Sequence, residues 1–195
     1  SMNKKPPISH WSYSSLITFL RNPLAWYKRY VEKVYDTPSS PASFVGRAGH
    51  VALEYFYKGL SKDEAILRGH TYLEDIQDVE INFGKATSKR AKKIKRDRMR
   101  QEYNQAISFY LARPPRHQVL GVEVNATTGV EGIALPLKAI SDLVVSSKVD
   151  KGALDIVDHK FVSTFTKQSS NKTLFIMQAI FNYYTIRNLY NRPVK

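Results

Sequence analysis

Two aspartates and a lysine between residues 139 and 160 have the types and spacing to bind a divalent metal ion and act on a phosphate. Asp142 lies inside the apolar run 139–145, while Asp158 and Lys160 close the run 154–160. Two neighbouring carboxylates repel each other unless a cation lies between them, and such oxygen ligands favour Mg²⁺ or Mn²⁺. A lysine beside that ion can hold an attacking water or neutralise charge that develops on a phosphate.

A β-hairpin is the element that would bring these side chains together. Both runs are short and rich in β-branched residues, and the polar segment 148–152 between them contains Gly152. This pattern predicts two strands joined by a turn. Because side chains alternate along a strand, Asp158 and Lys160 should share one face, with Asp142 on the neighbouring strand.

A histidine lies upstream on a predicted helix. The apolar spacing of residues 44–56 is helical, and His50 and Glu54 are one turn apart on the same face. A single histidine on a helix is more often a packed or surface residue than a functional one. Glu54 fits a supporting role at a site and a salt bridge equally well.

Residues 85–100 form a strongly basic run in a chain of net charge +13, and a helix is predicted from there to just before Pro114. Crowded cations on a helix repel one another, a cost that is easier to understand if phosphates neutralise them. A solvated helix face is the alternative. The polar loop 164–172 adds two lysines. The candidate nucleic-acid-binding residues are Lys85, Lys89, Arg90, Lys92, Lys93, Lys95, Arg96, Arg98, Arg100, Lys167 and Lys172.

Two further polar residues lie on predicted elements. Glu123 is on the predicted strand 119–124. It could be a third acidic metal ligand or simply a polar residue on a half-exposed strand, and the sequence favours neither. Gln178 lies on a final helix from about Thr173, beside a predicted core stripe, and a glutamine buried there needs hydrogen-bond partners. The stripe consists of Leu174, Met177, Phe181 and Tyr184. Pro136 predicts an edge position for the strand that it begins.

Length and composition limit the class of protein. The 195 residues predict a single domain, and 30 Lys and Arg against 17 Asp and Glu favour a polyanionic partner. The chain has no cysteine, which excludes disulfides and cysteine-ligated zinc or iron–sulfur centres. No stretch is long enough to span a bilayer and no signal core is present, so we expect a soluble cytoplasmic protein without a membrane partner.

Taken in order, these pieces resemble the PD-(D/E)XK nuclease superfamily, and specifically its RecB-like exonuclease branch. The resemblance is carried by the S-x-S opening at residues 12–14 with Asn22-Pro23, the G-x-x-x-H motif ending at His50, Asp142, the D-H-K at residues 158–160, and Gln178. It departs from the family at Asn22, where some relatives have an iron–sulfur cysteine, and at Asn182, where the family has a tyrosine.

The resemblance implies an α/β fold with a PD-(D/E)XK core, also called restriction-endonuclease-like. A small mixed sheet would be flanked by helices, with a mostly helical part at about 12–112 and a catalytic β-β-β-α core at about 117–190. It also implies that Asp142, Asp158 and the main-chain carbonyl of His159 hold Mg²⁺ or Mn²⁺, with His50 and Glu123 as further candidates. Lys160 would position water, and Gln178 would orient Lys160 or a phosphate.

The function implied is that of a metal-dependent deoxyribonuclease, an exonuclease of phage, plasmid or DNA repair and recombination context. We expect DNA ends or single strands as substrate, no iron–sulfur cluster, and a helicase or recombination protein as a candidate partner. Three alternatives stay open: a structure-specific endonuclease, a nucleic-acid-binding module with vestigial carboxylates, and a basic structural protein that needs no metal.

Overall fold

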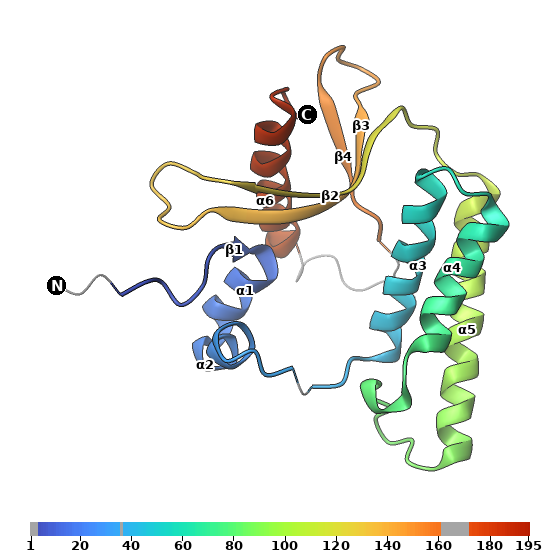
Figure 1. The fold of residues 1–195 in the computed structure, drawn as a ribbon. Helices are drawn as coiled ribbons and strands as arrows, with labels where there is room; N and C mark the ends of the chain where they lie inside the picture. The colour runs from blue at the N-terminus through green and yellow to red at the C-terminus, as the bar shows by residue number, and fades with distance from the viewer. Residues whose placement is uncertain (1–3, 36, 161–171) are drawn as a thin grey trace. The chain divides into compact units, whose positions relative to one another are not determined.

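The computed structural model describes residues 4–35, 37–160 and 172–195 (Figure 1). The chain divides into two compact units, which are described separately. The sheet unit comprises Ser1–Asp36, Glu123–Val157 and Lys167–Lys195. The helical unit comprises Thr37–Val122 and Asp158–Thr166. The action of both units as one nuclease domain stays a prediction.

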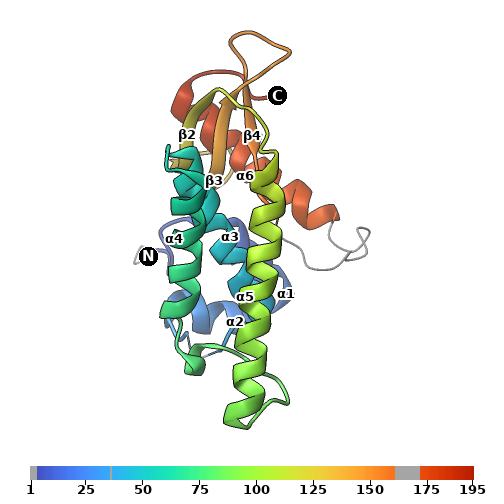
Figure 2. The same ribbon diagram turned by 90° about the vertical axis from the view of Figure 1, so that its right-hand side faces the viewer.

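The helical unit is built on three helices that lie side by side in Figures 1 and 2: α3 (Pro41–Tyr57), α4 (Lys62–Asp75) and α5 (Lys89–Ala112). A serine precedes each helix, and its side chain accepts a hydrogen bond from a backbone N–H of the first turn. Such caps satisfy donors that the helix itself leaves unpaired. The short helix η2 (Asp78–Glu80) lies between α4 and α5.

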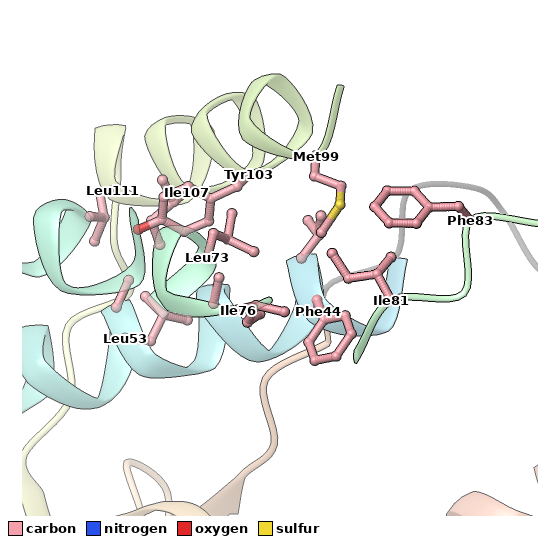
Figure 3. Packing of buried hydrophobic residues seen from close by; sticks show 13 residues of the cluster. Phe44, Leu53, Leu73, Ile76, Ile81, Phe83, Met99, Tyr103, Ile107 and Leu111 are labelled. Atoms are coloured by element: carbon pink, nitrogen blue, oxygen red, sulfur yellow. The ribbon is translucent and has the colours of Figure 1, made fainter. Parts of the chain in front are cut away.

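Apolar side chains from the three helices form the core of this unit, and Figure 3 shows their packing. The phenol of Tyr103 is buried at its centre, and its hydroxyl donates a hydrogen bond of 2.5 Å to the carbonyl of Ile66. Burial raises the pKa of this phenol. Gly69 lets α4 approach so closely, because a Cβ there would lie only 2.7 Å from the carbonyl oxygen of Ala48.

Two predicted helix boundaries are corrected by the structure. The apolar residues between positions 62 and 79 predict one helix over that range, but α4 ends at Asp75. The basic helix begins at Lys89, because the side chain of Ser88 caps it, so Lys85 lies before the helix.

The sheet unit contains a mixed sheet in which β3 is central. It comprises β1 (Trp11–Ser12), β2 (Val119–Thr128), β3 (Leu137–Ser146) and β4 (Leu154–Val157), with the first residues of β2 counted in the helical unit. The order is β1-β3-β2, and β4 also pairs with β3. The pairing is parallel between β1 and β3 and antiparallel between β3 and β4. A mixed sheet with helices confirms the predicted α/β class.

The edge position that Pro136 predicted is therefore wrong. β3 begins one residue after the proline, so the ring removes no hydrogen bond from the sheet ladder. The carbonyl of Pro136 instead accepts a hydrogen bond of 2.9 Å from the backbone N–H of Trp11.

Two short helices follow β1 in the sequence. α1 (Tyr13–Arg21) is capped by Ser12, and α2 (Pro23–Trp26) is capped by Asn22. Pro23 can begin a helix, and the sequence predicts one from Leu24 to about Lys33. The structure instead has α2 followed by a π-helical turn, Tyr27–Val31. The indole N–H of buried Trp26 donates to the hydroxyl of Ser15 at 3.1 Å, which ties α2 to α1.

The last helix, α6 (Lys172–Tyr190), packs on β3 through a face that contains polar residues (Figure 1). Its buried side chains include Phe181, Asn182, Thr185 and Ile186, whereas Tyr184 is 39% exposed. The predicted core position of Tyr184 is therefore wrong. The hydroxyl of Thr185 donates to the carbonyl of Phe181 at 2.8 Å, so this polar side chain can be buried at little cost.

Candidate active site

The predicted hairpin is present, and the pairing of its strands shows where the two aspartates lie along them. Leu143 pairs with Val157, and Ser146 pairs with Leu154. Asp142 comes just before Leu143 and Asp158 just after Val157. Each aspartate is therefore the neighbour of one member of the Leu143–Val157 pair. Asp142 thus lies in the middle of β3, and Asp158 comes directly after the end of β4.

The D-H-K segment itself is not part of a strand, contrary to the prediction. β4 ends at Val157, and residues 158–160 follow it directly. Burial nonetheless alternates as predicted, with Asp158 and Lys160 exposed and His159 buried. The aromatic side chains of the helical unit surround His159, and the sequence of the hairpin gives no sign of them.

In the sheet unit, Asp142 and Gln178 lie on the surfaces by which β3 and α6 pack. Asp142 is half-buried on the same face of β3 as Val144, which packs against Ile186 of α6. Gln178 is half-buried and lies three, four, seven and eight residues before the buried residues of α6, so it is on the same side of the helix as they are. The role of Gln178 at the site stays a prediction.

In the helical unit, Asp158 and Lys160 form an ion pair. The Nζ atom of Lys160 lies 2.5 Å from Oδ2 of Asp158, with the two side chains 45% and 33% exposed. The lysine therefore already neutralises a carboxylate at the place where the sequence predicted a charged site.

The rings of Tyr57, Tyr110 and His50 pack around His159. The imidazole of His159, 7% exposed, stacks on Tyr57 with ring centroids 5.7 Å apart and an angle of 6° between the planes. His50 meets it edge-on at 5.9 Å, and Tyr110 does so at 6.3 Å. The structure thus brings the histidine of α3 against the D-H-K segment, although 109 residues separate His50 from His159.

Tyr57 and Tyr110 are members of this site that the sequence did not reveal. Their hydroxyl oxygens lie 2.5 Å apart, and burial together with this hydrogen bond raises the pKa of Tyr57. Tyr57 is seven residues after His50, close to two helical turns, so helical spacing was a usable signal. No spacing could have found Tyr110, because it lies on α5. Glu54 pairs with Lys58 at 2.6 Å, as its salt-bridge alternative predicted.

Glu123 lies in β2 with a backbone that no regular strand has. Its φ is +48°, the left-handed region that residues other than glycine seldom adopt, and its side chain is exposed. A left-handed residue within a strand is typical of β-bulges, which are common near active sites. Its role as a third acidic ligand stays a prediction.

Part of the basic run holds α5 in place within the helical unit. Lys95 donates to the carbonyl of Phe83 at 2.9 Å, and Arg96 donates to the carbonyl of Leu73 at 3.0 Å. Arg100 binds both carboxylate oxygens of Glu74, at 2.5 and 3.1 Å. That hydrogen bonding holds the pKa of Glu74 below its usual range.

Other cations of the run face solvent. Lys92 is half-buried, and its ammonium group lies 5.6 Å from the ring centre of Phe83. Lys167 lies outside the described residues, and Lys172 is described only as the first residue of α6. The exposed cations are Lys85, Lys89, Arg90, Lys93 and Arg98. Lys89 and Arg90 lie in the first turn of α5, where the helix dipole disfavours positive charge.

The predicted metal ligands are oxygen donors, the kind that hard divalent cations prefer. Within residues 4–35, 37–160 and 172–195, no group of three or more His, Cys, Asp or Glu residues is arranged to hold a metal ion. Mg²⁺ does not require such a group, because one or two carboxylates with water and substrate phosphate commonly suffice. Asp142, Asp158 and a main-chain carbonyl supply oxygen donors of that type.

Comparison with known proteins places the chain in a family. The model of the PD-(D/E)XK nuclease superfamily matches residues 10–186, a span that includes His50, both aspartates, Lys160 and Gln178. No individual curated protein matches the chain significantly. Among the helices that the structure describes, none is long and apolar enough to cross a membrane. The chain belongs to the PD-(D/E)XK nuclease superfamily.

Proposed function

We propose that the chain is a Mg²⁺- or Mn²⁺-dependent deoxyribonuclease that degrades DNA from its ends, as an exonuclease of the RecB-like branch. Membership of the superfamily implies a metal-dependent nuclease. The observation that carries the rest is the packing of His50 against His159, at 5.9 Å between ring centres. It joins the G-x-x-x-H motif of α3 to the D-H-K segment, and the resemblance to that branch depends on both.

The residues divide into ligands and groups that act on the phosphate. Asp142, Asp158 and the carbonyl of His159 would hold the metal ion, with His50 and Glu123 as further candidates. A bound ion of this kind lowers the pKa of water and polarises a phosphoryl oxygen. Gln178 would orient Lys160 or a phosphate oxygen from its place on the packed face of α6.

Lys160 can stay beside Asp158 when that aspartate binds a cation. An ionised carboxylate has two oxygens and about four acceptor positions, so one oxygen can ligate a metal while the other accepts from an ammonium group. The pair at 2.5 Å thus already places a positive charge next to the proposed metal ligand. Held there, the charge would orient the attacking water and stabilise negative charge that grows on the phosphate.

DNA as substrate is supported by the charge of the chain and by the exposed cations of α5. Five cations of the basic run face solvent after the others have made contacts within the unit. Such cations bind phosphates without sequence preference. A preference for ends or single strands and a helicase or recombination partner are part of the proposal and rest on the resemblance alone. A cytoplasmic place of action is also part of the proposal.

Cleavage of matched substrates tests the proposal. Linear single-stranded, linear double-stranded and covalently closed circular DNA would be incubated with Mg²⁺, Mn²⁺ or EDTA. An exonuclease degrades the linear forms in the presence of metal and spares the closed circle. Cleavage of the circle would instead support the endonuclease alternative, and DNA binding without cleavage would support the module with vestigial carboxylates.

Two variants in the hairpin test whether cleavage depends on Asp158. Asp158→Asn should abolish cleavage, whereas Asp155→Asn, three residues earlier on β4, should retain it. Asp155 pairs in the sheet with Val145, so its substitution reports on damage to the strand. Equal activity of the two variants would remove Asp158 from the site.

A further inference from the structure

A pocket of about 810 Å³ opens at one end of the helical unit, where α3 and α5 end and α4 begins. Figure 2 shows the end of α5 and the start of α4 at the same end of this unit. The volume lies within the range of ligand sites, roughly 300–1,000 Å³. Aromatic and basic side chains line the pocket: Phe56, Tyr57, Lys62, Arg113, Arg116 and His117.

The charge of this lining suits an anion. Lys62, Arg113 and Arg116 are exposed cations, and no Asp or Glu is among the residues that line the pocket in the described part of the chain. The C-terminal ends of α3 and α5 carry about half a negative charge each, and the N-terminal end of α4 about half a positive one. Three full positive charges exceed these partial charges, so the pocket is net positive.

The segment that carries both arginines is stiff. Arg113 and Arg116 flank Pro114 and Pro115, whose rings fix φ near −65°. A stiff backbone has less conformational freedom to lose when a ligand binds. Arginine also binds phosphate through two parallel N–H groups, which a lysine cannot do.

Tyr57 connects this pocket to the D-H-K segment. Its ring lines the pocket and stacks on the imidazole of His159 at 5.7 Å. Its hydroxyl lies 2.5 Å from that of Tyr110, and its ring is 6.1 Å from the ring of His117. Only the ring of Tyr57 would thus lie between a ligand in the pocket and His159, the residue between Asp158 and Lys160.

We propose that this pocket holds one nucleotide of a single DNA strand, with the phosphate on Lys62, Arg113 and Arg116 and the base against Phe56. Stacking on aromatic rings beside a basic groove is how proteins hold single strands without sequence preference. The inference rests on the proposed nuclease function and adds a subsite beside its chemistry. The subsite is distinct from the basic half of α5, because Ala112 lies 19 residues (112 − 93) beyond Lys93, roughly 28 Å along the helix.

Binding in EDTA tests the subsite without any cleavage. The full chain would be titrated into a 5′-phosphorylated thymidine tetranucleotide, labelled at its 3′ end, and followed by fluorescence anisotropy at several salt concentrations. Arg113→Gln/Arg116→Gln should weaken binding about fivefold near 0.1 M salt and reduce the log–log salt slope by about 0.7, for one lost phosphate contact on a single strand. Lys148→Gln/Lys151→Gln, which removes two exposed charges from the turn between β3 and β4, should change neither.

Two more variants complete the test. Phe56→Leu should weaken binding about fivefold or more with an unchanged slope, because it removes stacking and no charge. Lys62→Gln reports on a different helix, should the double arginine variant fail to fold. If the double arginine variant folds and binds with wild-type affinity, the subsite is overturned. If that variant does not fold, wild-type affinity in Lys62→Gln overturns the subsite. Loss of affinity in the arginine variant with none in Phe56→Leu overturns the assignment of a base and leaves an anion site.

The outcome is independent of the nuclease proposal. If the wild-type chain cleaves no DNA with either metal while the pocket variants lose binding, the nuclease function fails and the subsite stands. If it cleaves DNA while the arginine variant binds the tetranucleotide like the wild type, the subsite fails and the nuclease function stands.

Discussion

The exposed cations of α5 should account for much of the affinity for DNA, and the structure separates them from cations that hold the fold together. We consider the variant in which Lys89, Arg90, Lys93 and Arg98 are all replaced by Gln. All four side chains are exposed. The comparison variant replaces Lys95, Arg96 and Arg100, which bind Phe83, Leu73 and Glu74 respectively.

The expected magnitude follows from the number of phosphates released. Each contact on a single strand contributes about 0.7 to the slope of log K against log salt, so four contacts contribute about 2.8. If the affinities of wild type and variant converge near 1 M salt, the variant binds on the order of 600-fold more weakly at 0.1 M. Between about 50 and 200 mM salt, wild-type affinity should fall about 50-fold more than that of the variant.

Anisotropy titrations of single-stranded DNA in EDTA at three salt concentrations measure both quantities. The comparison variant loses three positive charges but should change the slope far less, because those cations already contact the protein. It should instead unfold at a lower temperature, since it releases α5 from α4 and from the loop before it. If the exposed variant keeps the wild-type slope, or if both variants change it equally, the cations of α5 form a solvated surface and the reasoning fails.

Four further outcomes are expected. Lys160→Ala should lower the cleavage rate by roughly 10²-fold or more, the effect of losing one preorganised electrostatic group, while calorimetry with Mn²⁺ shows undiminished metal binding. Asp142→Asn should weaken Mn²⁺ binding in the same calorimeter, and unchanged affinity would exclude it as a ligand. Gly69→Ala should destabilise the chain by on the order of 1–2 kcal/mol in urea unfolding, because overpacking against Ala48 exceeds the gain in helix propensity. Arg100 lowers the pKa of Glu74 from 4.5, so the ion pair should stabilise the fold fully above pH 4.5 and lose this effect as the pH falls through the lowered pKa. Glu74→Gln should therefore flatten this part of the curve of unfolding free energy against pH.

Local patterns in the sequence predicted the hairpin correctly. Two β-branched runs around a glycine-containing turn leave few alternatives, and Leu143 indeed pairs with Val157. The same patterns could not show that the strand ends at Val157. The side chains that surround His159 come from Tyr57 and Tyr110, which are distant in the sequence. Where a strand ends thus depends on tertiary contacts that no local pattern contains.

The basic run shows a second limit of sequence reasoning. Nine cations in sixteen residues predict a charged helix, but not which of them face solvent. Arg100 is bound to Glu74, 26 residues earlier, and Lys95 to a carbonyl 12 residues earlier. On α6, apolar patterning selected Tyr184 for the core, whereas Thr185 is buried because its hydroxyl bonds within the helix.

The burial of His159 has a consequence for its two neighbours. In an extended segment, consecutive side chains point in opposite directions, so enclosing the middle residue turns both flanking residues outward together. Tyr57, Tyr110 and His50 enclose His159, while Asp158 and Lys160 face out as an ion pair. A functional pair must be held within about 0.5 Å of its productive geometry, and exposed side chains cannot provide that rigidity themselves. If Asp158 and Lys160 act on a phosphate as proposed, the enclosure of His159 would provide this rigidity, and α3 contributes both His50 and Tyr57 to it.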